Sequence, residues 1–484
     1  MGNATIVSLE AFKRAHERSG IRQRLHEHFD QWLDRVEEHM NGKPPTLEQM
    51  TEAVFTLRQE LTGRVSEALV GEAHGETLVQ QTLPCPHCGR RLHAQGPHPR
   101  TVETRVGPVR LSRPYFYCLR CQEGFYPLDE VLQLAERRKQ WDLQKSSARL
   151  VAEVPYETAS ELFETLTGLS FSDHIAHEVV GEVSDGLTVL SVSPTAEEVQ
   201  HKIAHVAQGK GWRPIGVLAI DGAAVPTRPE AAKGGRPGRK HKRAKRARWQ
   251  GQWREAKGFR FYLVDRERIV HLLSWHQVQS DEELAEALRQ VQAAGLIPEA
   301  QVRLCVIADG AKWIWTHVQA LFPSAVQILD YYHCSEHLHQ VAAVQFGDSP
   351  AHQTEWVETI VARLFCGEVE EVIKGLQHIK APDPQAAEEI RKLIGYLTNH
   401  QQRVDYGFAR KAGYPIGSGG IESANKFISH VRLKRSGAWW YVEKANEMLA
   451  LRCAKYNGTF DRIFEAYIQR VKPCAGKTLS VKNA

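Results

Sequence analysis

The chain has 484 residues, of which 42% are hydrophobic and 25% charged, and its formal net charge is +5. This length and composition predict a globular α/β protein of two to four domains. No apolar run approaches the roughly 18 residues that a membrane span needs. The N-terminus lacks the apolar core of a signal peptide, so we expect a cytoplasmic protein without a membrane partner.

Residues 1–78 are predicted to form an N-terminal helical region. Apolar side chains recur there at the three- and four-residue spacing of an amphipathic helix, with few residues that would break it: Leu47, Met50, Val54, Leu57 and Leu61. The pattern changes at about residue 79, where Cys, Gly and Pro become frequent. We therefore expect the helices to end before a second, differently built module.

Residues 79–130 carry two C-x-x-C pairs, Cys85 with Cys88 and Cys118 with Cys121. Between them the alternating stretch TVETRVGPVRLSRPYFYC, with Gly-Pro at its centre, predicts a β-hairpin that brings the pairs together. Four thiolates in a cytoplasmic chain favour one structural Zn²⁺ ion over redox or chance pairs. Neighbouring arginines are compatible with nucleic-acid contact: Arg90, Arg91, Arg100, Arg105 and Arg110.

Residues 131–200 are predicted to be helical again. The segments YETASELFETLTG and LSFSDHIAHEVVGEV indicate two short helices joined by a Gly-containing turn. Ser172 is placed to cap the second helix. Such a pair is compatible with a helix-turn-helix that binds DNA, and equally with an ordinary helical hairpin.

Residues 210–334 predict a mixed sheet. Three β-rich runs follow at short spacing, PIGVLAIDG, FRFYLVD and IVHLLSWHQV, so we expect three antiparallel neighbours. Strands then alternate with helices (DEELAEALRQVQAAG, VRLCVIADG, AKWIWTHVQALF, AVQILDYYH), which predicts parallel pairing. This order is that of an RNase H-like catalytic core. Residues 335–412 are predicted to be a helical insertion into it.

Two of the predicted strands end in Asp-Gly, at Asp221 and at Asp309. Adjacent strands would place both carboxylates at one edge of the sheet, where like charges need a cation or a shared proton. Two Mg²⁺ ions, or Mn²⁺, with about three carboxylates can act on a phosphodiester. Glu422, after the glycines of PIGSGGIES, is the third candidate, which makes residues 413–470 a catalytic helix region. Each Asp-Gly alone is also a common turn.

Asp330 follows the last predicted strand in ILDYYHCSEH, where it can join the acids or cap the next helix. In the same segment, His333, Glu336 and His337 fit the H-x-x-E-H pattern of inverted zinc proteases. That chemistry needs both histidines on one helical face. Because His333 is expected directly after a strand, we keep a zinc metalloprotease only as a remote alternative.

Residues 471–484 are predicted to be a tail. Positive charge is concentrated in two segments that precede it. Residues 228–248 hold ten Lys/Arg and one Glu, including Arg239, Lys240, Lys242 and Arg243. A second group follows Glu422: Lys426, Arg432, Lys434 and Arg435. Both groups predict contact with a polyanion such as DNA, and the first is also compatible with a solvated linker.

In the order of its motifs, the chain resembles bacterial insertion-sequence transposases of the ISKra type. These belong to the DDE group, whose catalytic domain is RNase H-like. The resemblance covers most of the chain, from about residue 80 to about residue 465. The motifs that carry it are CPHCG, GPVRLSRPYFYC before FYPLDE, DGAAVPTR, ADGAKWIW, AVQILDYYHCSEHL and YPIGSGGIESANK.

The resemblance implies that Asp221, Asp309 and Glu422 are a catalytic triad that binds two Mg²⁺ ions, with Asp330 and His333 beside it. It implies cleavage of DNA at element ends and joining of the freed 3′-hydroxyl to target DNA. DNA is then the partner, a homodimer or larger assembly joins the two ends, and the protein is nucleoid-associated. A domesticated DNA-binding protein without catalysis would keep the same residues and is the alternative.

Overall fold

The computed structural model describes residues 9–40, 44–229, 250–266 and 268–472. The chain forms two compact units, one made of Met1–Val179 with Phe464–Ala484 and the other of Val180–Ile463. The finer division into shorter segments stays a prediction. Among the described residues, none of the helices is both long and apolar enough to cross a membrane.

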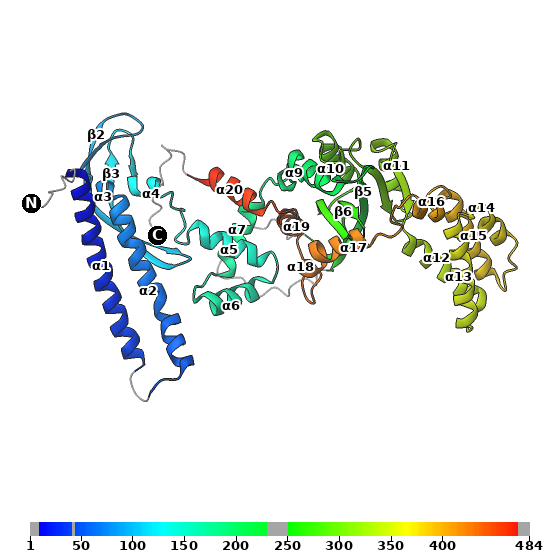
Figure 1. Ribbon diagram of the computed structural model, residues 1–484, viewed down its shortest axis with the longest axis horizontal. Helices are drawn as coiled ribbons and strands as arrows, with labels where there is room; N and C mark the ends of the chain where they lie inside the picture. Colours follow the sequence, from blue (N-terminus) through cyan, green and yellow to red (C-terminus); the bar gives the residue numbers. More distant parts are fainter. Residues whose placement is uncertain (1–8, 41–43, 230–249, 267, 473–484) are drawn as a thin grey trace, which may run out of the picture. The chain divides into compact units, whose positions relative to one another are not determined.

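The first unit begins with two long helices, α1 (Leu9–His39) and α2 (Leu47–Ala73), which pack against each other (Figure 1). Thr46 starts α2 with a capping box. Its hydroxyl accepts a hydrogen bond from the Gln49 N–H, and the Gln49 side chain accepts one from the Thr46 N–H. The helices that the N-terminal sequence predicts are therefore present.

An antiparallel sheet follows, with the strand order β1-β2-β3-β4 in the described residues. The predicted hairpin is confirmed, because β2 and β3 pair outward from Thr104 and Gly107. Gly107 has a φ of +114°, a conformation that favours glycine. The elements are α3 (Gly75–Leu78), β1 (Thr82–Pro84), β2 (Arg91–Thr104), β3 (Gly107–Cys118) and β4 (Glu123–Phe125).

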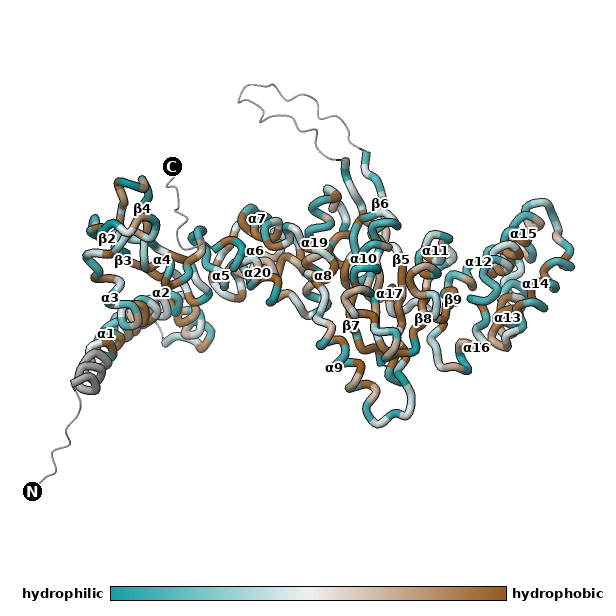
Figure 2. Tube along the Cα trace, turned by 90° about the horizontal axis from the view of Figure 1, so that it is seen from above, coloured by the Kyte–Doolittle hydropathy of each residue, from teal (hydrophilic) through white to brown (hydrophobic). Residues whose placement is uncertain are grey.

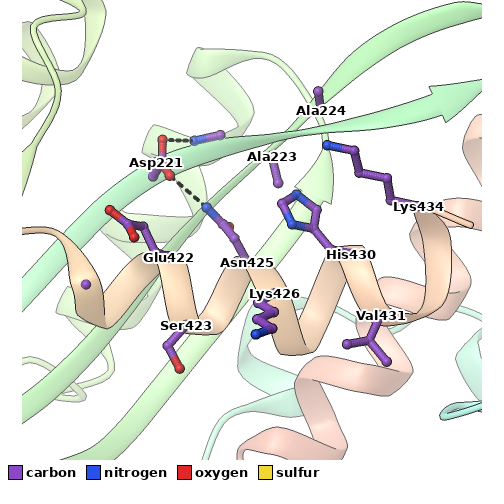
Figure 3. Close-up of a pocket in the computed structure, with 12 residues that line it drawn as sticks. Asp221, Ala223, Ala224, Glu422, Ser423, Asn425, Lys426, His430, Val431 and Lys434 are labelled. Carbon is purple, nitrogen blue, oxygen red and sulfur yellow. Dashed lines mark hydrogen bonds between the residues drawn. The ribbon is translucent and has the colours of Figure 1, made fainter. Parts of the chain in front are cut away.

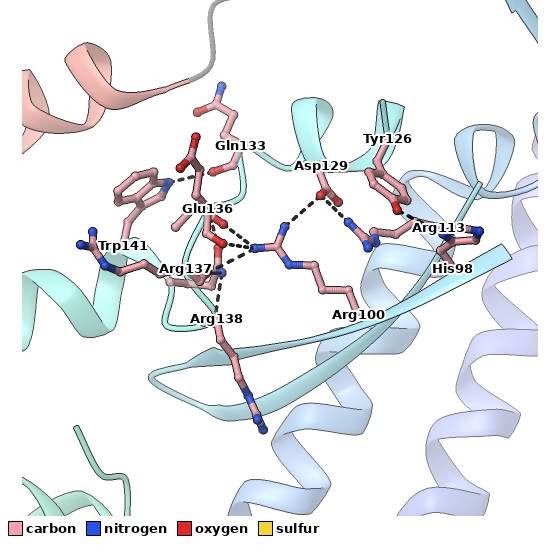
Figure 4. Close-up of polar contacts among 12 residues, drawn as sticks. His98, Arg100, Arg113, Tyr126, Asp129, Gln133, Glu136, Arg137, Arg138 and Trp141 are labelled. Carbon is pink, nitrogen blue, oxygen red and sulfur yellow. Dashed lines mark hydrogen bonds and ion pairs between the residues drawn. The ribbon is translucent and has the colours of Figure 1, made fainter. Parts of the chain in front are cut away.

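Two arginines tie this hairpin to α4 (Pro127–Val131), the helix after it (Figure 4). Arg100 on β2 and Arg113 on β3 both donate to the Asp129 carboxylate of α4. Arg100 also donates to main-chain oxygens of residues 135–137. Because the Arg100 guanidinium makes these hydrogen bonds within the protein, it is poorly placed for the nucleic-acid contact that the sequence made plausible.

The expected pair of short helices is formed by α6 (Tyr156–Thr167) and α7 (Asp173–Ser184). α6 ends at Gly168, whose φ of +66° is left-handed. Ser172 Oγ accepts from the Ile175 N–H at 3.3 Å, so the predicted cap is present. The first unit also contains α5 (Trp141–Val151) and most of α20 (Phe460–Val471).

The second unit is built on a mixed sheet, with the strand order β7-β6-β5-β8-β9 in the described residues. β5, β6 and β7 are antiparallel neighbours, and β8 and β9 continue the sheet parallel to β5. The predicted pairing is therefore confirmed. The strands are β5 (Ile215–Thr227), β6 (Gln252–Asp265), β7 (Arg268–Val278), β8 (Arg303–Ala308) and β9 (Val326–Leu329).

Helices cover this sheet because its central strands are apolar on both faces. Each residue from Ile215 to Ile220 is buried, which is typical of a strand covered on both sides. Figure 2 shows hydrophobic residues gathered along β5 and β8. Contacts with the strands are made by α9 (Ala196–Ala207) and α10 (Asp281–Ala293) on β6 and by α19 (Val442–Tyr456) on β7, while α8 (Val189–Val192) and α11 (Lys312–Leu321) pack against α10.

Residues 335–412 are helical, as predicted. α12 (Tyr331–Phe346) packs against α13 and α15, and α14 packs against α15. The bounds are α13 (Pro350–Cys366), α14 (Val369–Gln377), α15 (Pro384–Asn399) and α16 (Tyr406–Lys411). The chain then returns to β5 through three consecutive helical segments, α17 (Gly419–Ala424), the π-helix η1 (Asn425–His430) and α18 (Val431–Leu433).

Candidate functional site

Two strands bring Asp221 and Asp309 side by side. β5 and β8 are parallel, and Ile220 of β5 pairs with Ala308 of β8. The residues that follow each of these, Asp221 and Asp309, therefore lie next to each other in the sheet. Asp309 Oδ1 accepts from the Ala311 N–H at 2.8 Å, which holds the carboxylate at the strand end. The structure thus places the two Asp-Gly acids together.

The surroundings of Asp221 disfavour its charged form. Burial raises the pKa of Asp221 to about 6, and the negative charge of Asp309 adds to this, while the Gly222 N–H opposes it. The Gly222 N–H donates to Oδ1 and the Asn425 amide donates to Oδ2, each at 2.7 Å. A carboxylate in this environment is stabilised by a nearby cation.

Glu422 reaches the same place from α17. Gly420 lets this helix lie close to β6, since a Cβ at Gly420 would stand 2.5 Å from the ring of Tyr262. The main-chain oxygen of Gly420 also accepts from the Arg260 guanidinium at 2.6 Å. As a result, Glu422 and Asp221 line one pocket, and their carboxylates lie on the same side of it (Figure 3).

The pocket has a volume of about 780 Å³ and carries both signs of charge. Asp221 and Glu422 lie toward one end, and His430 and Lys434 toward the other (Figure 3). Asp309 is not one of its lining residues. A pocket with this distribution can hold a cation and an anion next to each other.

A π-helical turn decides which side chains face the pocket. Asn425–His430 is π-helical, and its turn is wider than the 3.6 residues of an α-helix. In an uninterrupted α-helix, His430 and Lys434 would be rotated by roughly 80° and 120° from Glu422. With the wider turn, residues four apart stay on one face, and four of them line the pocket: Glu422, Lys426, His430 and Lys434.

Asp330 is fully buried and is connected to Glu422 through Ser418. Its Oδ1 accepts from the Ser418 N–H at 2.7 Å, and Ser418 Oγ donates to Glu422 Oε1 at 2.9 Å. Its Oδ2 accepts from the His333 N–H at 3.2 Å, which caps α12. Burial raises the pKa of Asp330, and these two N–H groups oppose that. Asp330 thus caps the next helix, one of the two roles considered from the sequence, and its connection to Glu422 is indirect, through Ser418.

His333 lies in the first turn of α12 and not directly after a strand, because β9 ends at Leu329 and Asp330 already caps the helix. The sequence argument against a zinc protease, that His333 directly follows a strand, is therefore wrong. His333 and His337 lie in one helix, four residues apart. The His337 ring packs on Tyr396, with the ring centroids 4.2 Å apart. Within the described residues, the two histidines belong to no group suited to a metal ion.

The four predicted cysteine ligands come together in the first unit, with all their sulfur atoms within 4.8 Å of one another. Two similar turns hold them. The Gly89 N–H donates to the Cys85 main-chain oxygen, and the Gln122 N–H donates to that of Cys118. The N–H of Cys121 lowers the pKa of Cys118 to about 6, so this thiol ionises readily.

This cysteine cluster can hold a metal ion such as zinc. Four sulfur ligands form the tetrahedral set of a structural zinc site, which leaves no position for a substrate. In the part of the chain that the structure describes, the cysteines are the group of potential ligands that meets this spacing. The carboxylates of Asp221, Asp309 and Glu422 do not approach one another as closely.

A family model described as "Uncharacterised protein family (UPF0236)" matches residues 48–469. The chain belongs to this family. The matched range contains the four cysteines, the three acids and Asp330. No curated protein matches this UPF0236 chain.

Among solved structures, the Drosophila P element transposase strand transfer complex is similar to this UPF0236 chain. The similarity covers 68% of this chain and 80% of that chain, with 10% sequence identity and a TM-score of 0.23. A TM-score of this size does not establish a shared fold. The geometry of the site is therefore the basis for any statement about function.

The basic residues after Glu422 in this UPF0236 member are of two kinds. Lys426 and Lys434 line the pocket, and Arg435 is exposed. Arg432 is 4% exposed, and its guanidinium lies over the Trp440 ring, 5.0 Å from the centroid, so it packs inside the fold. The remaining predicted DNA-binding residues lie outside the described residues: Arg239, Lys240, Lys242 and Arg243.

Three polar residues of the UPF0236 pocket region were not singled out from the sequence. Asn425 lies three residues after Glu422, on the same helical face, so its spacing was a usable signal. His430 enters through the π-turn, for which the sequence shows no pattern. Ser418 contacts Asp330 across a separation of 88 residues, which only the fold reveals.

Proposed function

We propose that this protein is a DNA transposase that cleaves DNA at the ends of a mobile element and joins the freed 3′-hydroxyl to target DNA. One observation carries the proposal: Asp221 and Glu422 line one pocket, and Asp309 lies next to Asp221 at the end of the neighbouring strand. Their sheet has three antiparallel strands followed by parallel ones, the order expected of an RNase H-like catalytic domain. A carboxylate whose pKa is raised by burial and by a neighbouring acid, and which lines a pocket, marks a candidate functional site.

The side chains fit divalent metal ions. Burial and the neighbouring Asp309 raise the pKa of Asp221 to about 6. A bound cation would stabilise the ionised form of this carboxylate and lower its pKa again. Asp221, Asp309 and Glu422 would hold Mg²⁺ or Mn²⁺, which prefer carboxylate oxygens. When bound, two such ions supply Lewis-acid activation and charge neutralisation at a phosphodiester.

The remaining groups of the pocket bind and orient. Lys426 and Lys434 line the same pocket as the acids and are suited to phosphate oxygens of the DNA backbone. Ser418 holds Glu422 Oε1, and buried Asp330 holds Ser418. The lysines would therefore position the DNA strand, while the Asp330–Ser418 pair would keep the Glu422 carboxylate directed into the site.

DNA is the proposed partner. The cysteine module and the α6–α7 pair of the first unit are candidates for recognition of element ends, and residues 228–248 would add sequence-independent attraction to phosphates. Because two element ends must be joined, we propose a homodimer or larger assembly that acts on the nucleoid in the cytoplasm. The helices of residues 335–412 are candidates for contact with DNA or the second subunit.

Cleavage of DNA that carries the inverted repeats flanking the gene tests this proposal. With Mg²⁺, the wild type should cut at the repeat ends. Asp221→Ala and Glu422→Ala should each lower the rate by about 100-fold or more, because each removes charge that stabilises the transition state. Glu443→Ala is the control, since this glutamate of α19 has a side chain 75% exposed.

Equal cleavage by the wild type, the two pocket variants and the control would contradict the proposed triad. A wild type that binds the repeats but never cuts them would favour the non-catalytic DNA-binding alternative. Peptide hydrolysis that is lost in His337→Ala would favour the protease alternative.

A further inference from the structure

One row of residues crosses the sheet at Asp221. Asp221 on β5 pairs with Gly258 on β6, and Gly258 pairs with His276 on β7. Residues that pair directly across antiparallel strands point to the same face of a sheet, so Asp221 and His276 share a face with the glycine between them. A Cβ at Gly258 would stand 2.4 Å from Cδ2 of His276, so a larger residue would displace the ring.

Asn425 reaches this row from the π-helix η1. It is 5% exposed, and its Nδ2 donates to Asp221 Oδ2 at 2.7 Å (Figure 3). It also lies beside His276, whose pKa burial lowers to about 4, so that the imidazole is neutral at pH 7. The Asn425 amide thus lies between a buried histidine and a buried carboxylate, beside the position where Gly258 has no side chain, and it is hydrogen-bonded to the carboxylate.

The chemistry of its neighbours sets the direction of this amide. An ionised carboxylate only accepts hydrogen bonds, so Asn425 must turn its NH₂ group to Asp221 and its Oδ1 away from it. In the described residues, Asn425 Oδ1 and both ring nitrogens of His276 are buried without a hydrogen-bond partner. A neutral imidazole carries one N–H, which is the donor that Oδ1 lacks. The Asn425 side chain is also the group that opposes the lowered pKa of His276, which places the amide near enough to this ring to accept its N–H.

From this arrangement we infer that Asn425 is a positioning residue for the divalent-metal site at Asp221. Its N–H holds Asp221 Oδ2 in one direction and leaves the other lone pairs of the carboxylate for the cation, while His276 keeps the amide from turning over. Outer-shell partners of this kind change metal affinity by about 10–100-fold. The inference rests on the proposed function, because it takes Asp221 to be a metal ligand.

Asn457 is a matched control within the same unit. It is 6% exposed and also meets a histidine of β7, with Oδ1 3.0 Å from His271 Nε2. Its other partners are main-chain groups: the N–H and oxygen of Ser274 at 2.8 and 2.9 Å, and the oxygen of Val192 at 3.0 Å. Because none of these is a carboxylate, Asn457 stabilises the fold without touching a candidate metal ligand.

Mn²⁺ titration of the full-length protein tests the inference, with thermal unfolding measured for each variant. Binding that disappears in Asp221→Asn defines the site. We expect Asn425→Leu, which keeps the size and removes the donor, to weaken that binding by about 10–100-fold. Asn425→Ala gives the same comparison if the leucine variant does not fold. Asn457→Ala should lower the melting temperature and leave the Mn²⁺ affinity unchanged.

Asn425 variants that bind Mn²⁺ as tightly as the wild type, at a site that Asp221→Asn removes, would overturn the inference and leave the proposed function intact. A wild type without Asp221-dependent binding would overturn both. An equal loss of affinity in Asn457→Ala would also overturn the inference, because the effect would then follow from general stability.

Discussion

The cysteine cluster and the acid pocket are built in opposite ways. The cysteines come from two turns at the ends of one hairpin, and Cys85 and Cys121 are 36 residues apart. The acids come from β5, from the residue after β8 and from α17, and Asp221 accepts a hydrogen bond from Asn425, 204 positions away. A local cluster can therefore form with its own small module, whereas the pocket exists only when the whole sheet of the second unit has folded.

The two groups also differ in what their charge costs. The N–H of Cys121 lowers the pKa of the Cys118 thiol, whereas the neighbouring cysteines and burial raise that of Cys121, so the cluster readily loses its first proton, at Cys118. Burial raises the pKa of Asp221, so the ionised form of this carboxylate lowers the stability of the folded protein. Replacement of a cysteine in the cluster should therefore destabilise the first unit, as expected for a structural group. Replacement of Asp221 should stabilise the second unit, as expected for a functional group.

Removal of metal from the cysteine cluster should have the largest effect. The purified protein should contain about one zinc ion per chain. A chelator, or Cys118→Ser, should unfold the β1–β4 sheet, because structural zinc contributes roughly 10–16 kcal/mol in small domains. Hydrogen exchange should show loss of protection in β1–β4, while the β5–β9 sheet stays protected.

Cys366→Ser is the control for this experiment, because Cys366 is an exposed cysteine of α13 in the second unit. It should change neither the zinc content nor the exchange pattern. A protein that purifies without metal and keeps β1–β4 protected would remove the contrast between the two groups.

A smaller effect of opposite sign is expected for Asp221→Asn. The pKa of Asp221 is raised from 3.8 to about 6 in the folded protein, so the ionised carboxylate costs stability at pH values above about 6. This cost disappears as the pH falls below the unfolded value near 4. At about 1.4 kcal/mol for each pKa unit, the variant should be more stable by roughly 1–3 kcal/mol at pH 8 without divalent metal.

Chemical denaturation at pH 8 and at pH 4 measures this difference. Asp265→Asn is a control of opposite sign, because the Lys210 ammonium lowers the pKa of Asp265 and its loss removes a favourable contact. If Asp221→Asn were instead less stable than the wild type at pH 8, Asp221 would be a structural residue.

Structural features that depend only on a short stretch of sequence were predictable. The hairpin around Gly107 and the cap at Ser172 each depend on a few neighbouring residues. The pairing directions in the second unit were also predictable, because short connections favour antiparallel pairing and helical connections favour parallel pairing. That β5 and β8 are neighbours, which places Asp221 beside Asp309, was only a condition of the sequence argument and is seen in the structure.

Features that depend on tertiary packing were not predictable. The π-turn of η1 packs against β5 and brings His430 into the pocket, and no local pattern signals it. Arg432 was judged by its charge, but its partner Trp440 keeps it inside the fold. The cap that Asp330 forms on α12 was one of its two expected roles, but its hydrogen bond with Ser418, 88 residues further along the chain, is seen only in the fold.

Cleavage of the main chain by bound iron tests most directly whether the three acids form one divalent-metal site. With hydrogen peroxide as the oxidant and ascorbate to regenerate Fe²⁺, bound iron produces hydroxyl radicals that cut the polypeptide next to the ion. Cuts should appear near residues 221, 309 and 422 of the same protein, should decrease with excess Mg²⁺, and should be absent in Asp221→Asn. Cuts at only one of these segments, or at none, would contradict a shared metal site.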